Sequence, residues 1–374
     1  MLDRPCTVLG GLTPAHFMRR HWQQRPLLVR QALVDAAPLE RRALFALAAQ
    51  EEVESRLVVR EGARWRLEHG PFTRRRLPPL KQPGWTLLVQ GVDLHVEAAR
   101  RLLDQFDFMP AARLDDLMIS YASDRGGVGA HLDSYDVFLL QARGRRRWRW
   151  GRVARPQWRD DVPLKLLAQF DPTHDEVLGP GDLLYLPPGW GHDGTAVGGD
   201  CMTCSIGFRS PSRGELVREL LPRIADALAV NARLYRDPAH PATATPGALP
   251  PALIDFAQQA VQRALRDRAA VRDALGGWLS EPKPQVWFER GARLTPGQAV
   301  RLDRRTRMLY DRQRVYINGE SLRCGGPQGR LLRRLADRRR LSAAEWQAAD
   351  ANTRATLTAW TAAGWLHDAG GTDE

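Results

Sequence analysis

The sequence predicts an α+β protein with a double-stranded β-helix (jelly-roll) barrel, a helical region and a winged-helix-like C-terminal unit. Three observations support this fold class. Residues 1–212 contain many short strand-like runs separated by Gly and Pro, residues 213–281 have apolar residues at three- and four-residue spacing, and residues 282–374 combine a hairpin signal with short helices. A chain of 374 residues is long enough for two or three such domains.

The first region predicts two helices and then a barrel. Thr13 can cap a helix over residues 14–24 that has Pro14 at its first position, and a second helix is predicted over residues 39–51. Many short strands joined by turns favour a barrel or sandwich over a βαβ sheet. The predicted strands lie within residues 55–72, 85–92, 115–123, 135–142, 146–151, 181–188 and 201–208.

The second region predicts amphipathic helices over residues 214–235 and 251–279, joined by a loop rich in Pro and Ala. Their wide apolar faces must be covered. Either a dimer interface or packing against the barrel would cover them, and the spacing of the apolar residues does not distinguish these two possibilities.

The third region predicts a β-hairpin over residues 308–322 with Asn318-Gly319 at its turn. Helices are predicted over 327–339, 342–350 and 353–364, and a closing strand over 364–370. Short helices combined with a hairpin are typical of a winged helix, which can serve nucleic-acid binding or protein interaction.

The composition is that of an ordinary soluble protein, with 43% hydrophobic and 26% charged residues. No apolar run is long enough for a membrane span or a signal peptide, so the expected location is the cytoplasm. The four scattered cysteines fit a reducing compartment. A net charge of +12 favours anionic partners such as nucleic acid or ribosomes, although the arginines are spread along the whole chain.

Two motifs predict a metal site. His131 and Asp133 lie two residues apart, so an extended strand would point both side chains to the same face. The run GPGDLLYLPPGWGH then places Gly181, Pro187, Gly189 and His192 in the spacing of the second cupin motif. In this motif a turn leads into a buried strand, Pro and Gly end it, and the histidine begins the next strand facing the barrel interior.

Two histidines and one carboxylate on one face form the facial triad of iron(II) oxygenases. Cupins with other chemistry usually have His where this chain has Asp133, with a Glu downstream. Three protein ligands leave positions open for 2-oxoglutarate and O2. The alternative is a degenerate barrel in which His131 and His192 are core residues, but it requires both motifs to arise by coincidence.

A 2-oxoglutarate enzyme also needs a cation inside the barrel, and arginine matches a carboxylate with two parallel hydrogen bonds. A turn is predicted at Ala142–Gly144 and a strand after it. Arg146 shares its parity with Trp148, a ring that prefers the interior. We therefore expect Arg146 to point inward, and the other arginines of this run, Arg145, Arg147 and Arg149, to face outward.

Three blocks carry a family resemblance: HWQQRPLLVR, GGVGAHLDSYDVFLLQARGRRRWRWG and GDLLYLPPGWGHDG. In these blocks the chain resembles the ribosomal oxygenases, a JmjC-type branch of the cupin-like hydroxylases, and above all the bacterial members that hydroxylate an arginine of large-subunit ribosomal protein sixteen. The resemblance implies an iron ligated by His131, Asp133 and His192, 2-oxoglutarate bound at Arg146, and a homodimer formed through the helical region. Two departures are Trp190-Gly191 before the last ligand and an unusually Arg-rich C-terminal unit.

An arginine substrate needs acidic or polar groups at the pocket mouth, and the candidates are Asp115, Asp116, Asp136 and Ser205. Aspartates at strand ends also commonly make turns or caps. Three other functions share some of these features. They are a histidyl hydroxylase or demethylase on the same scaffold, a cupin enzyme that does not use 2-oxoglutarate, and a non-enzymatic nucleic-acid binder.

Overall fold

The computed structural model describes residues 2–227, 234–238, 241–292 and 294–370. These residues form two compact units: residues 2–210 with 285–287, and residues 211–284 with 288–370, apart from the gaps just named. The predicted three-domain division, with boundaries after residues 212 and 281, stays a prediction. None of the described helices is both long and apolar enough to cross a membrane.

The first unit combines three α-helices with the strands of the barrel. Thr13 accepts a hydrogen bond from the backbone N–H of His16, so it caps the first helix as predicted. The helices are α1 (Pro14–Arg20), α2 (Arg41–Leu47) and α3 (Glu97–Leu103), with 3₁₀ turns at Thr7–Leu9, Val92–Leu94, Asp104–Phe106 and Ala111–Arg113. The strands are β1 (Leu27–Val29), β2 (Ser55–Glu61), β3 (Arg64–His69), β4 (Trp85–Val89), β5 (Leu114–Ala122), β6 (His131–Leu132), β7 (Asp136–Arg152), β8 (His174–Leu178), β9 (Leu183–Leu186) and β10 (Trp190–Phe208).

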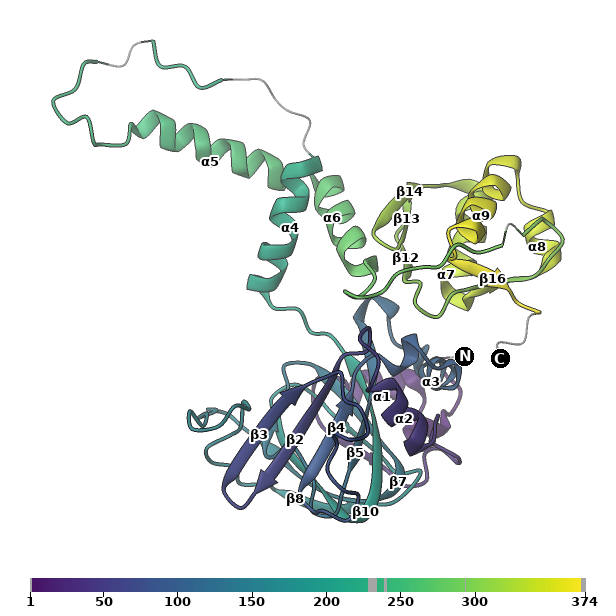
Figure 1. The fold of residues 1–374 in the computed structure, drawn as a ribbon. Coiled ribbons are helices and arrows are strands. Elements are labelled where there is room, and N and C mark those ends of the chain that lie inside the picture. Colours follow the sequence, from purple (N-terminus) through teal and green to yellow (C-terminus); the bar gives the residue numbers. More distant parts are fainter. Residues whose placement is uncertain (1, 228–233, 239–240, 293, 371–374) are drawn as a thin grey trace. The chain divides into compact units, whose positions relative to one another are not determined.

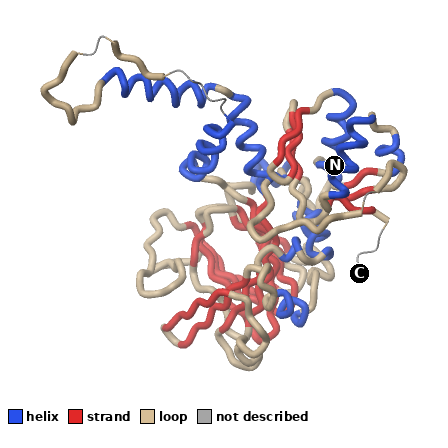
Figure 2. Tube along the Cα trace, turned by 45° about the horizontal axis from the view of Figure 1, so that its top comes forward, coloured by secondary structure: helices blue, strands red, loops and turns tan. Residues whose placement is uncertain are grey.

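All ten strands belong to one curled sheet in the order β1-β9-β7-β10-β5-β4-β2-β3, with β6 joined to β10 and β8 joined to β7. Every pairing is antiparallel, and the strands curve around a common interior (Figures 1 and 2). The interior face carries a cluster of large apolar residues from β7, β8 and β9: Val137, Leu139, Trp148, Trp150, Leu178, Leu184 and Leu186. The jelly-roll prediction is confirmed.

Two long strands differ from the sequence prediction. The predicted turn at Ala142–Gly144 is a bend inside a continuous β7, which pairs with β10 from Asp136 to Arg152. Gly144 has a φ of +64°, and residues 198–201 of β10 bulge out opposite it. A bulge bends a strand without ending it, and in the sequence a glycine at a bulge has the same pattern as a glycine at a turn.

The turn before β9 requires a glycine. Gly181 has a φ of +89°, and a Cβ atom there would lie 2.6 Å from the carbonyl oxygen of Leu33. Leu183–Leu186 is then fully buried, as predicted, and β10 begins two residues before His192. The local sequence thus sets where the last predicted ligand enters the barrel.

The second unit contains the helical region and the C-terminal elements. The helices are α4 (Arg213–Ala227), α5 (Pro251–Arg266), α6 (Arg268–Ser280), α7 (Gly326–Arg338), α8 (Ala343–Gln347) and α9 (Ala351–Ala362). The strands are β11 (Val300–Leu302), β12 (Met308–Tyr310), β13 (Arg314–Ile317), β14 (Glu320–Arg323), β15 (Arg340–Leu341) and β16 (Leu366–Asp368).

The helix predicted over residues 251–279 is two helices. Asp267 has an extended backbone, and its carboxylate accepts hydrogen bonds from the N–H groups of Ala269 and Ala270, so it caps α6. An aspartate competes for backbone donors in this way, which favours caps over helix interiors. Of the helix predicted over 214–235, residues 228–233 lie outside the described part of the chain.

The winged-helix elements form as predicted. Asn318 and Gly319 both have positive φ angles and join β13 to β14, and β12 adds a third strand. Strand β16 closes a second small sheet in the order β15-β11-β16. Trp346 and Leu357 are fully buried among the apolar residues that these sheets share with α7, α8 and α9.

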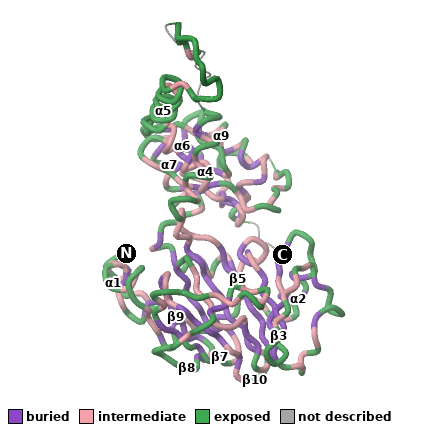
Figure 3. Tube along the Cα trace, turned by 90° about the vertical axis from the view of Figure 1, so that its left-hand side faces the viewer, coloured by how far each residue is buried: buried purple, intermediate pink, exposed green. Residues whose placement is uncertain are grey.

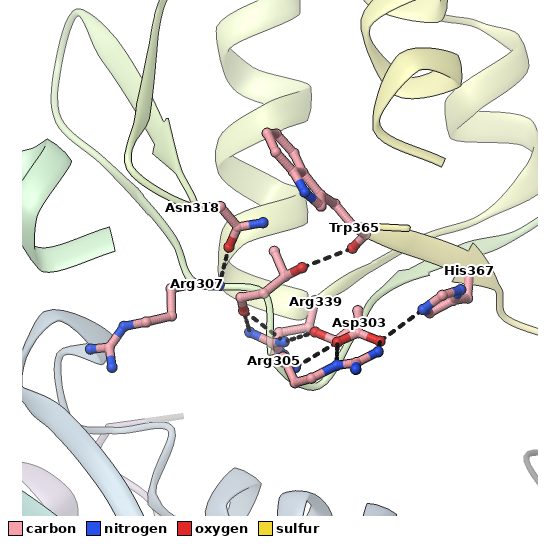
Figure 4. Close-up of polar contacts among 8 residues, drawn as sticks. Asp303, Arg305, Arg307, Asn318, Arg339, Trp365 and His367 are labelled. Carbon is pink, nitrogen blue, oxygen red and sulfur yellow. Dashed lines mark hydrogen bonds and ion pairs between the residues drawn. The ribbon is translucent and has the colours of Figure 1, made fainter. Parts of the chain in front are cut away.

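A polar cluster fastens β11 to β16 in this unit (Figure 4). Asp303 is 4% exposed, and its carboxylate accepts hydrogen bonds from Arg305 Nε at 2.8 Å and from His367 Nε2 at 2.8 Å. Burial opposes ionisation of Asp303, but the hydrogen bonds from His367 and Arg305 outweigh it and hold the pKa below the ordinary value.

The Asp303 cluster makes the stability of the protein pH-dependent. A lowered pKa adds stability that is present above the unfolded carboxyl pKa of about 3.9 and is lost as the pH falls below it. We expect Asp303→Asn to lower the free energy of unfolding by about 2 kcal/mol at pH 7. In thermal melts followed by circular dichroism, its midpoint should fall less between pH 5 and pH 3 than that of the wild type. An equal fall in both proteins would contradict this role.

Candidate metal centre

The three predicted ligands meet on the interior face of the barrel. His131 lies in β6, Asp133 follows directly after it, and His192 is the third residue of β10. The backbone register pairs His192 with His131 on one side and with Trp150 of β7 on the other. Paired residues point to the same face of a sheet, so both imidazoles face the interior that Trp150 occupies.

The donor atoms are close enough to share one ion. His192 Nε2 lies 3.6 Å from Asp133 Oδ2, and His131 Nε2 lies 4.0 Å from Asp133 Oδ1. One ligand atom from each of the three residues lies within 4.8 Å of the other two. This is the only group of three or more His, Cys, Asp or Glu side chains with such geometry in the described ranges.

Backbone carbonyls orient both imidazoles. His131 Nδ1 lies 2.9 Å from the carbonyl oxygen of Gly129, and His192 Nδ1 lies 3.2 Å from that of Trp190. A carbonyl accepts a hydrogen bond, so each ring carries its proton on Nδ1 and turns an unprotonated Nε2 to the site. Burial, with a smaller contribution from His131, lowers the pKa of His192 to about 4, so its ring is neutral at pH 7, as metal binding requires.

The alternation predicted for the arginine-rich strand is confirmed. Arg145, Arg147 and Arg149 are exposed, whereas Arg146 is 4% exposed and Trp148 is buried beside it. Arg147 pairs with Asp175 and Arg149 with Asp193 on the outer face. Arg146 has no such partner: within the described chain, its Nε and Nη2 atoms are buried and make no hydrogen bond.

Apolar residues surround the buried guanidinium. Arg146 is the cross-strand neighbour of Ala196 in β10 and of Leu178 in β8. Its guanidinium carbon lies 5.6 Å from the centre of the Trp148 ring. Arg146 is four residues along β7 from Trp150, the cross-strand neighbour of His192, which corresponds to about 13 Å of strand. The arginine and the ligands therefore share one interior face, with a strand segment between them.

Asp136 has a different environment from the one predicted. It is fully buried, and its carboxylate accepts hydrogen bonds from Tyr185 Oη at 2.6 Å, Gln23 Nε2 at 3.0 Å and Ser210 Oγ at 3.3 Å. Arg113 Nη2 lies 3.4 Å away. These groups join the N-terminal segment to the ends of β7 and β10, so the structure gives Asp136 a structural role, and we do not propose it as a substrate contact.

Asp115, Asp116 and Ser205 lie on the wall of the barrel. The register between β5 and β10 shifts between Ile206 and Phe208, so Asp115 and Asp116 both lie opposite Gly207. Asp116 is 6% exposed and accepts a hydrogen bond from the N–H of Gly91, while Asp115 pairs with Arg209 at 2.9 Å. Ser205 is paired with Leu139, whose side chain belongs to the interior cluster.

Tyr135 lies beside the predicted site and was not identified from the sequence. Its ring is partly exposed and would lie 3.7 Å from a Cβ atom at Gly207. Burial raises the pKa of its phenol, and the charges of Asp133, Asp116 and Asp115 raise it further. The phenol is therefore close to a predicted metal ligand and to both aspartates of β5. Its position two residues after Asp133 was the one available signal.

Two protein families match the chain. The JmjC domain family matches residues 101–216, and the ROXA-like winged helix family matches residues 262–367. The chain is 36% identical to the ribosomal protein uL16 3-hydroxylase of Escherichia coli over 277 residues, which is 72% of each protein. It is 34% identical to a probable ribosomal oxygenase of Haemophilus influenzae over 55% of this chain and 52% of that protein.

Solved structures give the same result for the fold. The structure of the E. coli ribosomal oxygenase YcfD in complex with cobalt and 2-oxoglutarate has a TM-score of 0.80 and 31% sequence identity, and the match covers 96% of this chain and 99% of that one. An X-ray structure of the same E. coli protein has a TM-score of 0.85, with 95% of this chain and 98% of that chain covered. These likenesses include both units.

Proposed function

Because the chain belongs to the JmjC-type ribosomal oxygenases, we propose that it hydroxylates an arginine side chain of the large-subunit ribosomal protein uL16. We propose iron(II) as the metal, 2-oxoglutarate and O2 as co-substrates, and the cytoplasm as the place of action. We also propose the roles of the site residues.

The observation that carries the proposal is the buried guanidinium of Arg146, which lies on the same interior face as the three ligands and has no ion-pair partner among the described residues. A buried charge without a partner is costly, so its presence favours an anionic ligand. The distal carboxylate of 2-oxoglutarate would pair with it. A cupin enzyme that does not use this co-substrate has no need for an interior cation at this position.

The donor set fits iron(II). Two imidazoles and one carboxylate on one face leave adjacent positions open, as a bidentate keto acid and O2 require. We propose that His131, Asp133 and His192 hold the ion. When bound, iron(II) with 2-oxoglutarate and O2 supplies the oxidising power that converts a C–H bond to C–OH, with succinate and carbon dioxide as co-products.

The residues around the metal would bind, orient and shield. Gly129 and Trp190 fix the two imidazole rings through their carbonyl oxygens. Arg146 would fix the far end of the co-substrate. The interior Trp148 and Trp150 rings are buried, so they exclude water from this part of the barrel.

A substrate guanidinium would fit the acidic mouth of the site. Tyr135 offers a ring face, and Asp115, Asp116 and Ser205 offer oxygen atoms on the adjacent wall. An arginine side chain is planar and cationic, so it both stacks on an aromatic ring and donates to carboxylates. This arrangement supports arginine over a neutral side chain as the target.

The test of the proposed function is succinate release from 2-oxoglutarate with iron(II) and a uL16 peptide, with mass spectrometry of the peptide. We expect one added oxygen on the arginine for each succinate formed. Succinate with an unmodified peptide would reject the substrate and keep the oxygenase. Oxidation of a histidine, or loss of a methyl group, would point to a histidyl hydroxylase or a demethylase on the same scaffold.

Asp116→Asn tests the substrate pocket. Asparagine keeps an oxygen that can accept from Gly91 but removes the charge that faces a guanidinium. We expect the KM for the arginine peptide to rise about 10- to 100-fold, which corresponds to the loss of one charge-assisted hydrogen bond.

A peptide with citrulline, the neutral isostere, in place of arginine provides the control. The wild type should prefer arginine strongly, and Asp116→Asn should lose most of that preference. An unchanged preference would remove Asp116 from the substrate site.

We also propose that residues 213–281 form a homodimer interface, that residues 1–212 are the catalytic domain, and that residues 282–374 are the winged-helix domain. Helix α5 has no buried residue among those described, and Figure 3 shows it exposed. Ile254, Val261 and Leu265 lie on one stripe of this helix and are 50%, 56% and 45% exposed.

Light scattering should give a dimer mass for the wild type and a monomer mass for the double variant Ile254→Glu, Val261→Glu.

A further inference from the structure

The second unit carries a positive surface that the proposed oxygenase chemistry does not use. Between residues 301 and 340 the sequence has thirteen arginines and four acidic residues, and no lysine. The acidic residues are Asp303, Asp311, Glu320 and Asp337. This segment contains the three-stranded sheet β12-β13-β14 and helix α7, which pack together.

Three arginines gather where the sheet meets the beginning of α7. Arg312 lies in the turn between β12 and β13, Arg323 ends β14, and Arg330 lies in the first half of α7. We call Arg312, Arg323 and Arg330 the wing surface. The N–H of Cys324 donates to the carbonyl oxygen of Gln313, which brings the end of β14 to the turn. Arg333, one helical turn beyond Arg330, donates to the carbonyl oxygen of Arg312 at 2.6 Å, which brings α7 to the same turn.

The charges of the wing surface are not neutralised by the protein. Arg312, Arg323 and Arg330 are exposed, and none has an ion pair with another described residue. The aspartates nearby are engaged by other arginines. Arg314 Nε lies 2.8 Å from Asp273, and Arg272 Nε lies 3.6 Å from Asp311.

The acidic groups around the wing surface do not cancel its positive charge. A small cavity of about 140 Å³ beside it is lined by Ala269, Arg272, Asp273, Asp311, Gln313, Arg314 and Arg323. Glu320, the acidic residue of the β13–β14 hairpin, is paired with Ile317 at the opposite end from the Arg314–Arg323 pair. The acidic group of the hairpin is thus three residue pairs away from the arginines, or about 10 Å.

We propose that the wing surface binds RNA through its phosphate backbone. Exposed guanidinium groups arranged along a strand end and a helix match a row of phosphates, since the planar fork of arginine gives paired hydrogen bonds to phosphate oxygens. The choice of RNA rests on the proposed function, because a ribosomal protein is surrounded by RNA. Such binding would place the enzyme close to its substrate.

The test uses the full-length chain without 2-oxoglutarate, so it does not depend on the oxygenase activity. A labelled single-stranded RNA oligonucleotide is titrated at several salt concentrations and followed by fluorescence anisotropy. The wing variant is Arg312→Ala, Arg323→Ala, Arg330→Ala. The control variant, Arg42→Ala, Arg75→Ala, Arg155→Ala, removes the same charge from exposed arginines of the first unit that have no ion pair with any described residue.

We expect the wing variant to bind RNA at least about tenfold more weakly and to reduce the slope of log K against log salt by about 2, the share of three phosphate contacts on a single strand. The control variant should bind like the wild type. Both should keep the wild-type melting temperature and peptide turnover. Equal weakening of the two variants would mean attraction by net charge alone and would overturn the proposal, as would unchanged binding in the wing variant.

Two further probes identify the class of partner. Duplex DNA of the same sequence and polyglutamate are titrated under the same conditions. Tighter binding to DNA than to RNA would assign the surface to DNA, and competition by polyglutamate as strong as that by RNA would assign it to an acidic polypeptide. Either result would overturn the RNA assignment while leaving the proposed hydroxylation intact.

Discussion

Replacing Asp133 by alanine is expected to abolish succinate formation, with a loss of at least about a thousandfold. Asp133 supplies the one carboxylate among three ligand atoms that lie within 4.8 Å of one another. Removing a partner that only orients a ligand typically costs 10- to 100-fold in metal affinity, so removing a ligand should cost more than about 100-fold. Calorimetric titration with a divalent metal and the succinate assay measure the two losses separately.

Asp193→Asn is the matched control for Asp133→Ala. Asp193 is next to His192 in sequence, but its carboxylate pairs with Arg149 on the outer face of the barrel. This variant should retain metal affinity and turnover close to those of the wild type. If Asp133→Ala kept its turnover, the ion would have to be held by other groups, and the assignment of the triad would fail.

Replacing Arg146 by methionine is expected to raise the KM for 2-oxoglutarate by about 100-fold or more. Breaking a buried charge pair by removing one partner costs about 3–5 kcal/mol, which corresponds to roughly 150- to 4000-fold in affinity. The KM of Arg146→Lys for 2-oxoglutarate should lie between those of the wild type and Arg146→Met, since lysine keeps the charge but loses the planar fork. Metal affinity should be unchanged, because Arg146 is not among the ligands.

Arg146→Met should weaken the binding of 2-oxoglutarate but stabilise the protein when no co-substrate is bound. Two buried nitrogen atoms of Arg146 make no hydrogen bond to the described residues, so the apo protein holds a poorly satisfied charge. Arg146→Met should therefore melt at a higher temperature than the wild type, and 2-oxoglutarate should no longer raise its melting temperature. Arg145→Met, one residue away on the outer face, should behave like the wild type. If 2-oxoglutarate raised the melting temperature of Arg146→Met as much as that of the wild type, a residue other than Arg146 would have to bind the distal carboxylate.

The metal centre could be predicted from sequence because each part of it is local. His131 and Asp133 are separated by one strand period, and the turn at Gly181 sets the path to His192 over a few residues. The inward direction of Arg146 followed from the two-residue period of a strand that also carries Trp148. Such patterns depend on neighbours in the chain, so one sequence is enough to identify them.

The parts that sequence could not predict depend on distant neighbours. Asp136 is buried because Gln23, Tyr185 and Ser210 converge on it from three segments. Both aspartates of β5 lie opposite Gly207 of β10 because of a register shift between the two strands. The helix break at Asp267 could not be predicted, because a 3.6-residue apolar period is compatible with an aspartate in a helix interior and with an aspartate that caps a new helix.

The pairing of β1 with β9 also affects how the chain is made. Leu27, Leu28 and Val29 are matched with Tyr185, Leu184 and Leu183, which are synthesised much later. Translation adds about 5–20 residues per second, so β9 is synthesised on the order of ten seconds after β1. During that interval its apolar side chains are open to chaperones, and nascent chains that stop before β10 is complete should remain sensitive to protease.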